Sequence, residues 1–129
     1  MIIDSSALIA VIAVEPEAQS FVEAMLAAPV ARLSAGSWIE LAAVITRRRA
    51  HGYALLTELV DRVGITIEPV TAEQAQIGHD AYRRYGIGTG HPARLNFGDC
   101  FAYALAKALG EPLLFKGGDF ARTDVTPAR

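Results

Sequence analysis

Short apolar runs alternate along this chain with longer segments in which apolar residues recur every three or four positions. The short runs predict four strands, at residues 1–3, 30–33, 65–70 and 112–115. The longer segments predict six helices, at residues 7–14, 17–28, 38–50, 53–63, 71–85 and 97–109. Strands that alternate with helices favour a mainly parallel sheet with helices on both of its faces. The chain is therefore predicted to adopt an α/β fold.

Capping residues and glycines mark several ends of these elements. Asp4 supplies a cap for the first helix. Thr71 caps a later helix, and Gln74 three residues on completes the pattern of a capping box. Asn96 opens the last helix, and before it residues 86–94 form the one clear loop, which is rich in glycine. Loops of this kind usually carry flexibility or function.

Length and composition indicate one globular domain. The chain has 129 residues, about the size of one domain, and we expect a single domain over residues 1–129 without a linker. Hydrophobic residues make up 52% and charged residues 20% of the chain, which excludes an intrinsically disordered protein. The net charge of −2 gives no global attraction for nucleic acid, so any such binding must depend on local cations.

The sequence favours a cytoplasmic protein that does not enter a membrane. Cys100 is the only cysteine and cannot form an internal disulfide, and we expect it to pack in the core because no basic partner lies in its segment. The first residues lack the basic start and the cleavage site of a signal peptide. Glu15 and Pro16 end the first apolar run well short of the roughly 20 residues that span a bilayer.

Four acidic residues lie where a parallel sheet would bring them together. Asp4 and Asp119 follow two predicted strands, while Glu40 and Asp99 lie in the first turns of helices that start near the same edge. Such sheets bind ligands beyond the carboxyl ends of their strands. We therefore expect the four carboxylates to converge.

Each acid also has a purely structural interpretation. Asp4 can cap a helix, Asp99 can complement a helix dipole, and Asp119 can begin a turn. Glu40 differs, because the residues on both sides of it in the segment 38–44 look buried. A carboxylate in such a place needs a cation, a metal or a proton.

Carboxylates gathered at one edge repel one another, so the arrangement favours a divalent cation or raised pKa values. Hard oxygen ligands indicate Mg²⁺ or Mn²⁺ over zinc. The three histidines, His51, His79 and His91, are scattered and match no zinc spacing. One or two such ions would polarise a phosphodiester and activate water for an in-line displacement.

Four blocks of the sequence carry a resemblance to a known family. They are the run MIIDSSAL at residues 1–8, the isolated Glu40 after Ser37, the run LNFGDCFAYALA at residues 95–106 and the run LFKGGDF at residues 114–120. In this order they resemble the PIN-domain nucleases and, more narrowly, the VapC toxins of bacterial toxin–antitoxin modules. The likeness runs from Met1 to about Val125. Asp119, twenty residues after Asp99, makes the last two blocks the most specific.

The resemblance implies a PIN fold, which is a three-layer α/β/α sandwich, and an endoribonuclease activity. The acids that it implies as metal-binding and catalytic are Asp4, Glu40, Asp99 and Asp119. The small hydroxyl residue that the family has near its first acid matches Ser5 or Ser6, which would orient a ligand or water. Asn96 would hold the Asp99 region, and its interpretation as a helix cap stays open beside this one.

The resemblance also implies partners. The chain would be the toxin of a type II toxin–antitoxin system, with RNA as its substrate and Mg²⁺ or Mn²⁺ as its cofactor. Family members commonly form homodimers. A VapB-type antitoxin would occupy the active-site groove, often presenting an arginine toward the acids.

Contacts with RNA phosphates must come from cations outside the acid cluster. Arg94 and Lys116 flank the acidic motifs in sequence and are the first candidates. Arg47 and Arg48 end a predicted helix, where the structural interpretation is a solvated helix end that the dipole favours. Further candidates are Arg49, Arg83, Arg84 and His91, and Tyr85 or His91 could stack on an unpaired base.

Two other interpretations compete with the nuclease. A haloacid-dehalogenase-type phosphatase also begins with a strand, an aspartate and a helix, but it needs a second aspartate where Ser6 stands. A catalytically silent RNA-binding or antitoxin-binding module would keep the same fold without cleavage. Retention of all four acids argues against the silent module.

Overall fold

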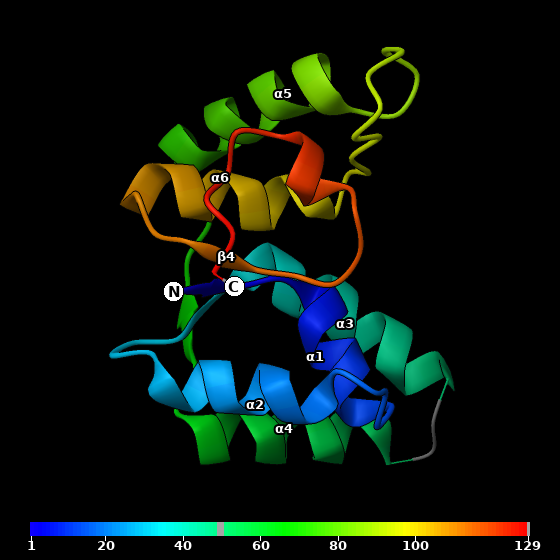
Figure 1. Cartoon of the computed structure of the whole chain (residues 1–129), viewed down its shortest axis with the longest axis vertical. Helices are drawn as coiled ribbons and strands as arrows, with labels where there is room; N and C mark the ends of the chain where they lie inside the picture. Colours follow the sequence, from blue (N-terminus) through cyan, green and yellow to red (C-terminus); the bar gives the residue numbers. More distant parts are fainter. Residues whose placement is uncertain (49–50, 129) are drawn as a thin grey trace.

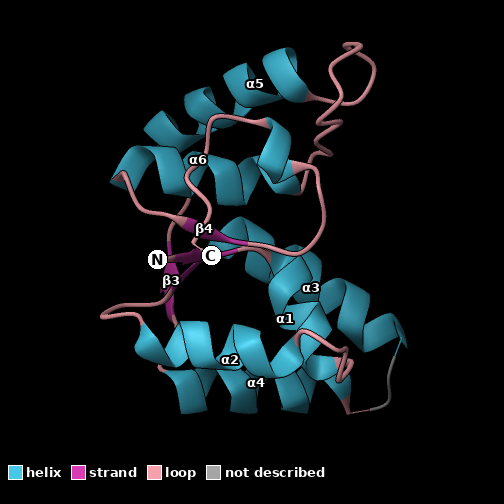
Figure 2. Ribbon diagram, viewed as in Figure 1, coloured by secondary structure: helices cyan, strands magenta, loops and turns pink. Residues whose placement is uncertain are grey.

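The computed structural model describes residues 1–48 and 51–128 as a four-stranded parallel sheet between two layers of helices (Figures 1 and 2). The strands are β1 (Ile2–Ile3), β2 (Arg32–Ser34), β3 (Thr66–Glu68) and β4 (Leu113–Leu114). The helices are α1 (Ser5–Ile12), α2 (Ala18–Ala27), α3 (Ala35–Arg48), α4 (Gly52–Val63), α5 (Ala72–Tyr85), α6 (Asp99–Leu109) and the short 3-10 helix η1 (Phe120–Arg122). The predicted α/β/α sandwich is therefore confirmed.

The order of the strands explains how the layers form. The order is β3-β2-β1-β4, and every neighbouring pair is parallel. The chain moves in one direction from β1 to β3 and then returns to the other side of β1 to form β4. Crossover connections between parallel strands are right-handed. The change of direction therefore puts α1 to α4 on one face of the sheet and α5 and α6 on the other (Figure 1). A crevice opens beyond the carboxyl ends of β1 and β4, where the order reverses.

Successive residues of the central strands face opposite helix layers, as the pleat requires. Ile2 and Leu113 belong to the hydrophobic cluster with α5 and α6, whereas Ile3 and Leu114 belong to the cluster with α1 to α4. All four side chains are fully buried. Strands covered on both faces read as continuous apolar runs, which is why these short runs could be recognised in the sequence.

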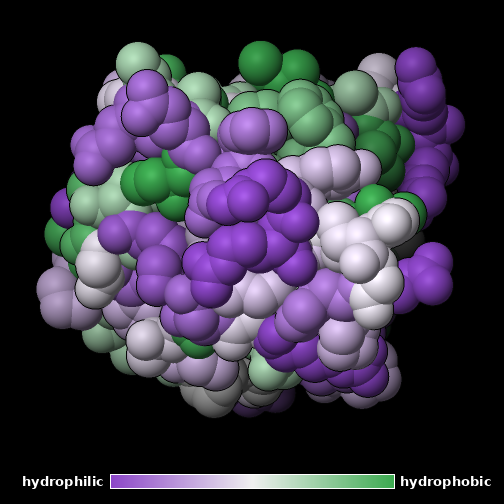
Figure 3. Space-filling model, turned by 90° about the horizontal axis from the view of Figure 1, so that it is seen from above, coloured by the Kyte–Doolittle hydropathy of each residue, from purple (hydrophilic) through white to green (hydrophobic). Residues whose placement is uncertain are grey.

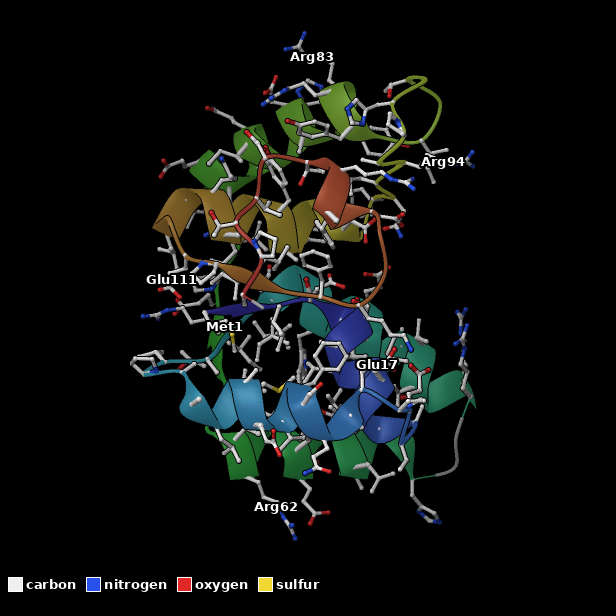
Figure 4. The ribbon with its side chains drawn as sticks, viewed as in Figure 1. Met1, Glu17, Arg62, Arg83, Arg94 and Glu111 are labelled. Atoms are coloured by element: carbon white, nitrogen blue, oxygen red, sulfur yellow. The ribbon has the colours of Figure 1, made fainter. Side chains whose placement is uncertain are left out.

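An ion-pair network closes the opposite end of the sheet. Arg32 of β2 pairs with Glu68 of β3 and with Glu111, which precedes β4. Glu111 also binds the ammonium group of Met1, and both residues are labelled on the same side of the molecule in Figure 4. The edge strand β3 is shorter than the predicted 65–70, and short, charged edges resist pairing with other chains.

Several helix ends differ from the prediction because local hydrogen bonds set them. The helix predicted at residues 38–50 begins at Ala35, where the Ser34 hydroxyl accepts the Gly36 N–H at 3.3 Å; residues 49 and 50 lie outside the described residues. Thr71 caps α5 as predicted, accepting the Gln74 N–H at 3.1 Å. The second bond of the capping box does not form, because Gln74 Oε1 is buried without a partner in the described part of the chain.

The outer surface of the α5 layer is mainly polar. Seen from above, hydrophilic side chains cover most of the centre of this face, and hydrophobic ones gather toward one edge (Figure 3). Such a division is expected of a helix that buries one stripe and exposes the other. None of the helices in residues 1–48 and 51–128 has both the length and the apolar character needed to cross a bilayer.

Candidate active site

Four acidic side chains line one cavity beyond the carboxyl ends of β1 and β4. The cavity measures about 310 Å³, and its acidic lining consists of Asp4, Glu40, Asp99 and Asp119. Asp4 directly follows β1, Glu40 lies in α3, Asp99 begins α6, and Asp119 immediately precedes η1. The structure thus brings together the four acids that the sequence analysis expected to converge, and they come from four separate segments.

Asp4 is fixed by the helix that it caps. Its carboxylate is buried, and Oδ2 accepts the Ser6 N–H at 2.9 Å and the Ser6 hydroxyl at 2.5 Å. The Ser6 oxygen in turn accepts the backbone N–H of Lys116 at 3.0 Å. Ser6 therefore joins the first acid to the segment after β4. The other serine, Ser5, lines the cavity.

Asp99 is fixed by a reciprocal pair of hydrogen bonds with Asn96. The Asn96 N–H donates to Asp99 Oδ2 at 2.7 Å, and the Asp99 N–H donates to Asn96 Oδ1 at 2.9 Å. This is the arrangement of a capping box, and it caps a first turn whose bonds, from Cys100 N–H to the Phe97 carbonyl and from Phe101 N–H to the Gly98 carbonyl, are of the 3-10 type. The regular helix α6 therefore begins at Asp99, two residues after the predicted start. The two interpretations of Asn96, a helix cap and a residue that holds Asp99, describe the same contact.

The Glu40 carboxylate packs directly against the backbone of Gly98. A Cβ added at Gly98 would overlap both carboxylate oxygens of Glu40. The backbone of Gly98 has φ −63° and ψ −38°, which any residue adopts, so only the approach of Glu40 requires a glycine here. Gly98 lies within the block at residues 95–106, and no role was predicted for it. No feature of the sequence alone marks this glycine, because the carboxylate that it accommodates lies on another helix.

The prediction that both neighbours of Glu40 are buried was wrong. Leu41 is fully buried, but Ile39 is 69% exposed. The helical period of α3 turns Ile39 outward, since successive residues of a helix lie about 100° apart. Glu40 is accordingly half-buried, at the border between the core and the cavity.

Burial and mutual repulsion raise the pKa values of three of the acids. Burial raises the pKa of Asp4 in spite of its hydrogen bonds. Burial and, second, the charge of Asp4 raise the pKa of Glu40. The pKa of Asp99 rises to about 7, mainly through burial; the Asn96 hydrogen bond opposes the shift, and the charges of Asp4, Asp119 and Glu40 add to it. Such a cluster favours the arrival of a cation or a proton.

The side chains around the cavity offer oxygen donors suited to a hard cation. No three Asp, Glu, His or Cys side chains within residues 1–48 and 51–128 are grouped closely enough to ligate one ion together. Mg²⁺ usually keeps several water ligands and binds to only one or two carboxylates, so this lining fits it. Cys100, behind Asp99, is buried, and burial raises the pKa of its thiol to about 11, as expected of a packing residue.

Lys116 lines the cavity, but its charge is already balanced. Its ammonium group pairs with Glu15 and with Glu17, at 3.1 Å for the second pair. These two acids lie in the connection between α1 and α2. Lys116 therefore ties that connection to the segment after β4.

The other basic candidates fall into two groups. Arg48 lines the cavity, Arg47 is exposed beside it, and Arg94 is exposed on the 86–94 loop with a φ of 52°. Arg83 and Arg84 pair with carboxylates on the α5 side of the molecule. Arg49 lies outside the described residues.

The sequence matches a known family over almost all of its length. The family model for the PIN domain matches residues 1–125. Ribonuclease VapC42 of Mycobacterium tuberculosis is 49% identical over 129 residues, which cover 99% of this chain and 98% of that relative. Ribonuclease VapC of Mycolicibacterium smegmatis is 46% identical over 126 residues, 97% of each chain.

Two solved structures share the fold. The crystal structure of Mycobacterium tuberculosis VapC20, a toxin described as cleaving the sarcin-ricin loop, superposes with a TM-score of 0.76 over 97% of this chain and 95% of that chain, at 18% identity. A toxin–antitoxin complex from Klebsiella pneumoniae gives a TM-score of 0.70 over 93% and 89% of the two chains, at 20% identity. At such identities the likeness concerns the fold alone.

The raised pKa of Asp99 predicts a pH-dependent effect of its replacement. Because the folded chain binds the Asp99 proton more tightly than the unfolded chain, this group favours folding below its ordinary pKa of 3.8, and that contribution is lost as the pH rises toward about 7. In EDTA, Asp99→Asn should therefore raise the Tm by several degrees at pH 7 and by little at pH 4. Thermal unfolding across this interval measures the difference. A gain in Tm that does not grow with pH would contradict the raised pKa of Asp99. Asp61→Asn on the exposed face of α4 is the control.

Gly98→Ala should displace the Glu40 carboxylate without unfolding the chain. Alanine favours a helix by about 1 kcal/mol over glycine, so the fold should persist while the added methyl group moves Glu40 toward water. The pKa of Glu40, which burial raises, should then fall toward its ordinary value. Carbon-detected NMR titration of the glutamate side chains measures this pKa. Gly118→Ala, where the added methyl group meets no atom within 4 Å, is the matched control. An unchanged Glu40 pKa in Gly98→Ala would refute the steric role.

Proposed function

This chain belongs to the PIN domain family and, within it, to the VapC ribonucleases, and from that membership we propose that it is a metal-dependent endoribonuclease acting as the toxin of a type II toxin–antitoxin system. The observation that carries the proposal is the single cavity lined by Asp4, Glu40, Asp99 and Asp119. A cavity with four carboxylates repels a phosphodiester unless a cation stands between them. RNA hydrolysis with a divalent cation accounts for both the family and the cavity.

Mg²⁺ or Mn²⁺ is the proposed cofactor. The four acids of the cavity, of which one or two would bind the ion directly, supply only hard oxygen donors, which both ions prefer. Burial raises the pKa of Asp4, and burial and, second, neighbouring charges raise the pKa values of Glu40 and Asp99, so a divalent cation would favour the ionised form of these three carboxylates. Bound there, the cation would supply Lewis-acid polarisation of the scissile phosphodiester.

Two of the four acids of the cavity are held by hydrogen bonds, and two are not. Ser6 holds Asp4 and Asn96 holds Asp99, so these two carboxylates are oriented before a substrate arrives. Within residues 1–48 and 51–128, no donor bonds to the side chain of Glu40 or Asp119. In the proposed reaction these two carboxylates, which accept no hydrogen bond from a described residue, are available to accept the proton of the attacking water.

A VapB-type antitoxin is the proposed protein partner. A second cavity of about 230 Å³, between α1 and α3, shares Ile9, Val44 and Arg48 with the acid-lined cavity. The two therefore form one groove, and the apolar lining of its outer part suits a bound peptide segment. A segment seated there would reach the acids directly. The related fold in the Klebsiella pneumoniae toxin–antitoxin complex supports this partnership. Because the proposed RNA substrate and the proposed antitoxin are cytoplasmic, the proposed site of action is the cytoplasm.

A homodimer through α5 and α6 is the proposed assembly. A cavity of about 410 Å³ between these helices is lined almost entirely by apolar groups. Three exposed apolar residues, Val70, Tyr82 and Phe97, surround it. Gln74 Oε1 is buried in its wall with no donor among the described residues. Exposed apolar patches of this kind mark interaction surfaces.

Native mass spectrometry tests both partnerships in one experiment. The purified chain should give the mass of two copies, and Tyr82→Glu, which puts a charge into the apolar surface, should shift it toward one copy. Coexpression with the cognate antitoxin should give a larger complex for both proteins, since the proposed antitoxin groove lies on α1 and α3. A wild-type chain that remains single at micromolar concentration would exclude the dimer.

Incubation of the antitoxin-free chain with a labelled mixed RNA pool tests the activity. Cleavage should require Mg²⁺ or Mn²⁺ and should stop in EDTA. Asp4→Asn and Asp99→Asn should each lower the rate by ~100-fold or more, because the amide keeps the shape of the side chain and loses its charge. Asp61→Asn, on the exposed face of α4, should retain the wild-type rate.

Failure of this experiment has a defined meaning. A folded wild-type chain that cleaves neither the pool nor total cellular RNA with either ion would favour the silent binding module. Cleavage that survives both Asp4→Asn and Asp99→Asn at the wild-type rate would exclude the carboxylate mechanism.

A further inference from the structure

Six of the ten lysine and arginine side chains in residues 1–48 and 51–128 are already paired with a carboxylate. Within residues 1–48 and 51–128, the paired ones are Arg32, Arg62, Arg83, Arg84, Lys107 and Lys116. The arginines in these ranges that form no ion pair with a described carboxylate are Arg47, Arg48, Arg94 and Arg122. An unpaired guanidinium group binds an incoming phosphate without first breaking an ion pair.

The first pair of unpaired arginines borders the acid-lined cavity at the end of α3. Arg48 lines the cavity itself, and Arg47 is exposed beside it. Glu40, Val44 and Arg48 are spaced by four residues, which places them on one face of the helix, and all three line the cavity. The same face of α3 therefore carries Glu40 and, two turns later, the guanidinium group of Arg48, which forms no ion pair with a described carboxylate.

The second pair borders the site through the 86–94 loop and η1. Arg122 lies in η1, three residues after Asp119, and its Nη1 donates to the Pro92 carbonyl at 2.8 Å. This bond ties the loop to the segment that carries the fourth acid. Arg94 lies on the same loop, and its side chain points outward from it (Figure 4).

The loop holds Arg94 in a defined conformation. Its φ of 52° is one that residues other than glycine rarely adopt. The backbone on both sides is hydrogen-bonded, with Ala93 N–H donating to His91 Nδ1 at 3.1 Å and Leu95 N–H donating to the Tyr85 carbonyl at 2.9 Å. A hollow of about 590 Å³ beside Arg94, lined also by His91, has room for an unpaired base.

We propose that a single RNA strand crosses the acid-lined cavity from the end of α3 to the 86–94 loop, with its phosphates held by Arg47 and Arg48 on one side and by Arg94 and Arg122 on the other. The path rests on the proposed ribonuclease function and defines how the substrate lies over that site. Figure 1 shows the end of α3 and the 86–94 loop on the same side of the molecule, with the segment after β4 between them. Cations on both borders supply the attraction that the net charge of −2 does not.

Fluorescence anisotropy with a labelled, mixed-sequence RNA of about 12 nucleotides tests the path. The parent protein is the Asp99→Asn chain in EDTA, so that no RNA is cut. Arg48→Gln and Arg94→Gln should each weaken binding about fourfold at about 0.15 M salt and lower the slope of log affinity against log salt by about 0.7. The two effects should multiply to about fifteenfold in the double variant. Arg62→Gln on α4, whose side chain points away from the site (Figure 4), should change the affinity less than twofold.

Cleavage kinetics in the otherwise wild-type chain give a second measurement. Arg48→Gln and Arg94→Gln should raise KM and leave kcat near its wild-type value, because the arginines hold the strand and the acids act on it. Affinities and KM values equal to those of Arg62→Gln, in a chain that binds and cuts RNA, would overturn the path alone. A wild-type chain that neither cuts nor binds RNA would overturn the ribonuclease proposal and the path with it.

Discussion

Repulsion among the four carboxylates of the cavity is the interaction that the surrounding structure must withstand. Burial and neighbouring charges raise the pKa of Asp99 to about 7, and burial raises the pKa of Asp4. Ser6 holds the carboxylate of Asp4, and Asn96 holds Asp99. Asp4 follows β1 and Asp99 begins α6, and the side chains of both elements are packed in the two hydrophobic clusters. The two hydrophobic clusters on opposite faces of the sheet therefore hold the acids in a place that their charges alone would not favour.

The order of the elements could be predicted because burial on both faces leaves a direct mark on the sequence. Ile2 and Ile3 face different helix layers, so the strand is apolar at every position. The ends of α3 and α6 could not be placed from periodicity. The Ser34 hydroxyl, which accepts the Gly36 N–H at the start of α3, does not belong to the apolar pattern, whereas Asn96 was recognised before α6 as a capping residue. Ile39 shows the same limit, since an apolar residue beside buried ones can still face water.

Three of the acids, Asp4, Asp99 and Asp119, could be predicted because each stands next to the end of a recognisable element, and Glu40, inside α3, could be predicted because it interrupts an apolar segment. Gly98 and Arg122 could not, because their roles depend on contacts between distant segments. Gly98 leaves room for the carboxylate of Glu40 on another helix, and Arg122 binds the carbonyl of Pro92. Lys116 illustrates the reverse case, since its position in the sequence suggested a free cation and the fold supplies Glu15 and Glu17 as partners.

The pairing of β4 with β1 has a consequence for the synthesis of a chain proposed to cut RNA. β4 is synthesised after the other three strands, yet it lies beside the first one, and the cavity lies beyond the ends of these two strands. Asp119 follows β4 in the sequence. Until the end of translation, Asp4 therefore lacks both the strand β4 beside β1 and the fourth acid. The acid-lined cavity is therefore complete only when β4 and the segment that carries Asp119 have emerged and folded.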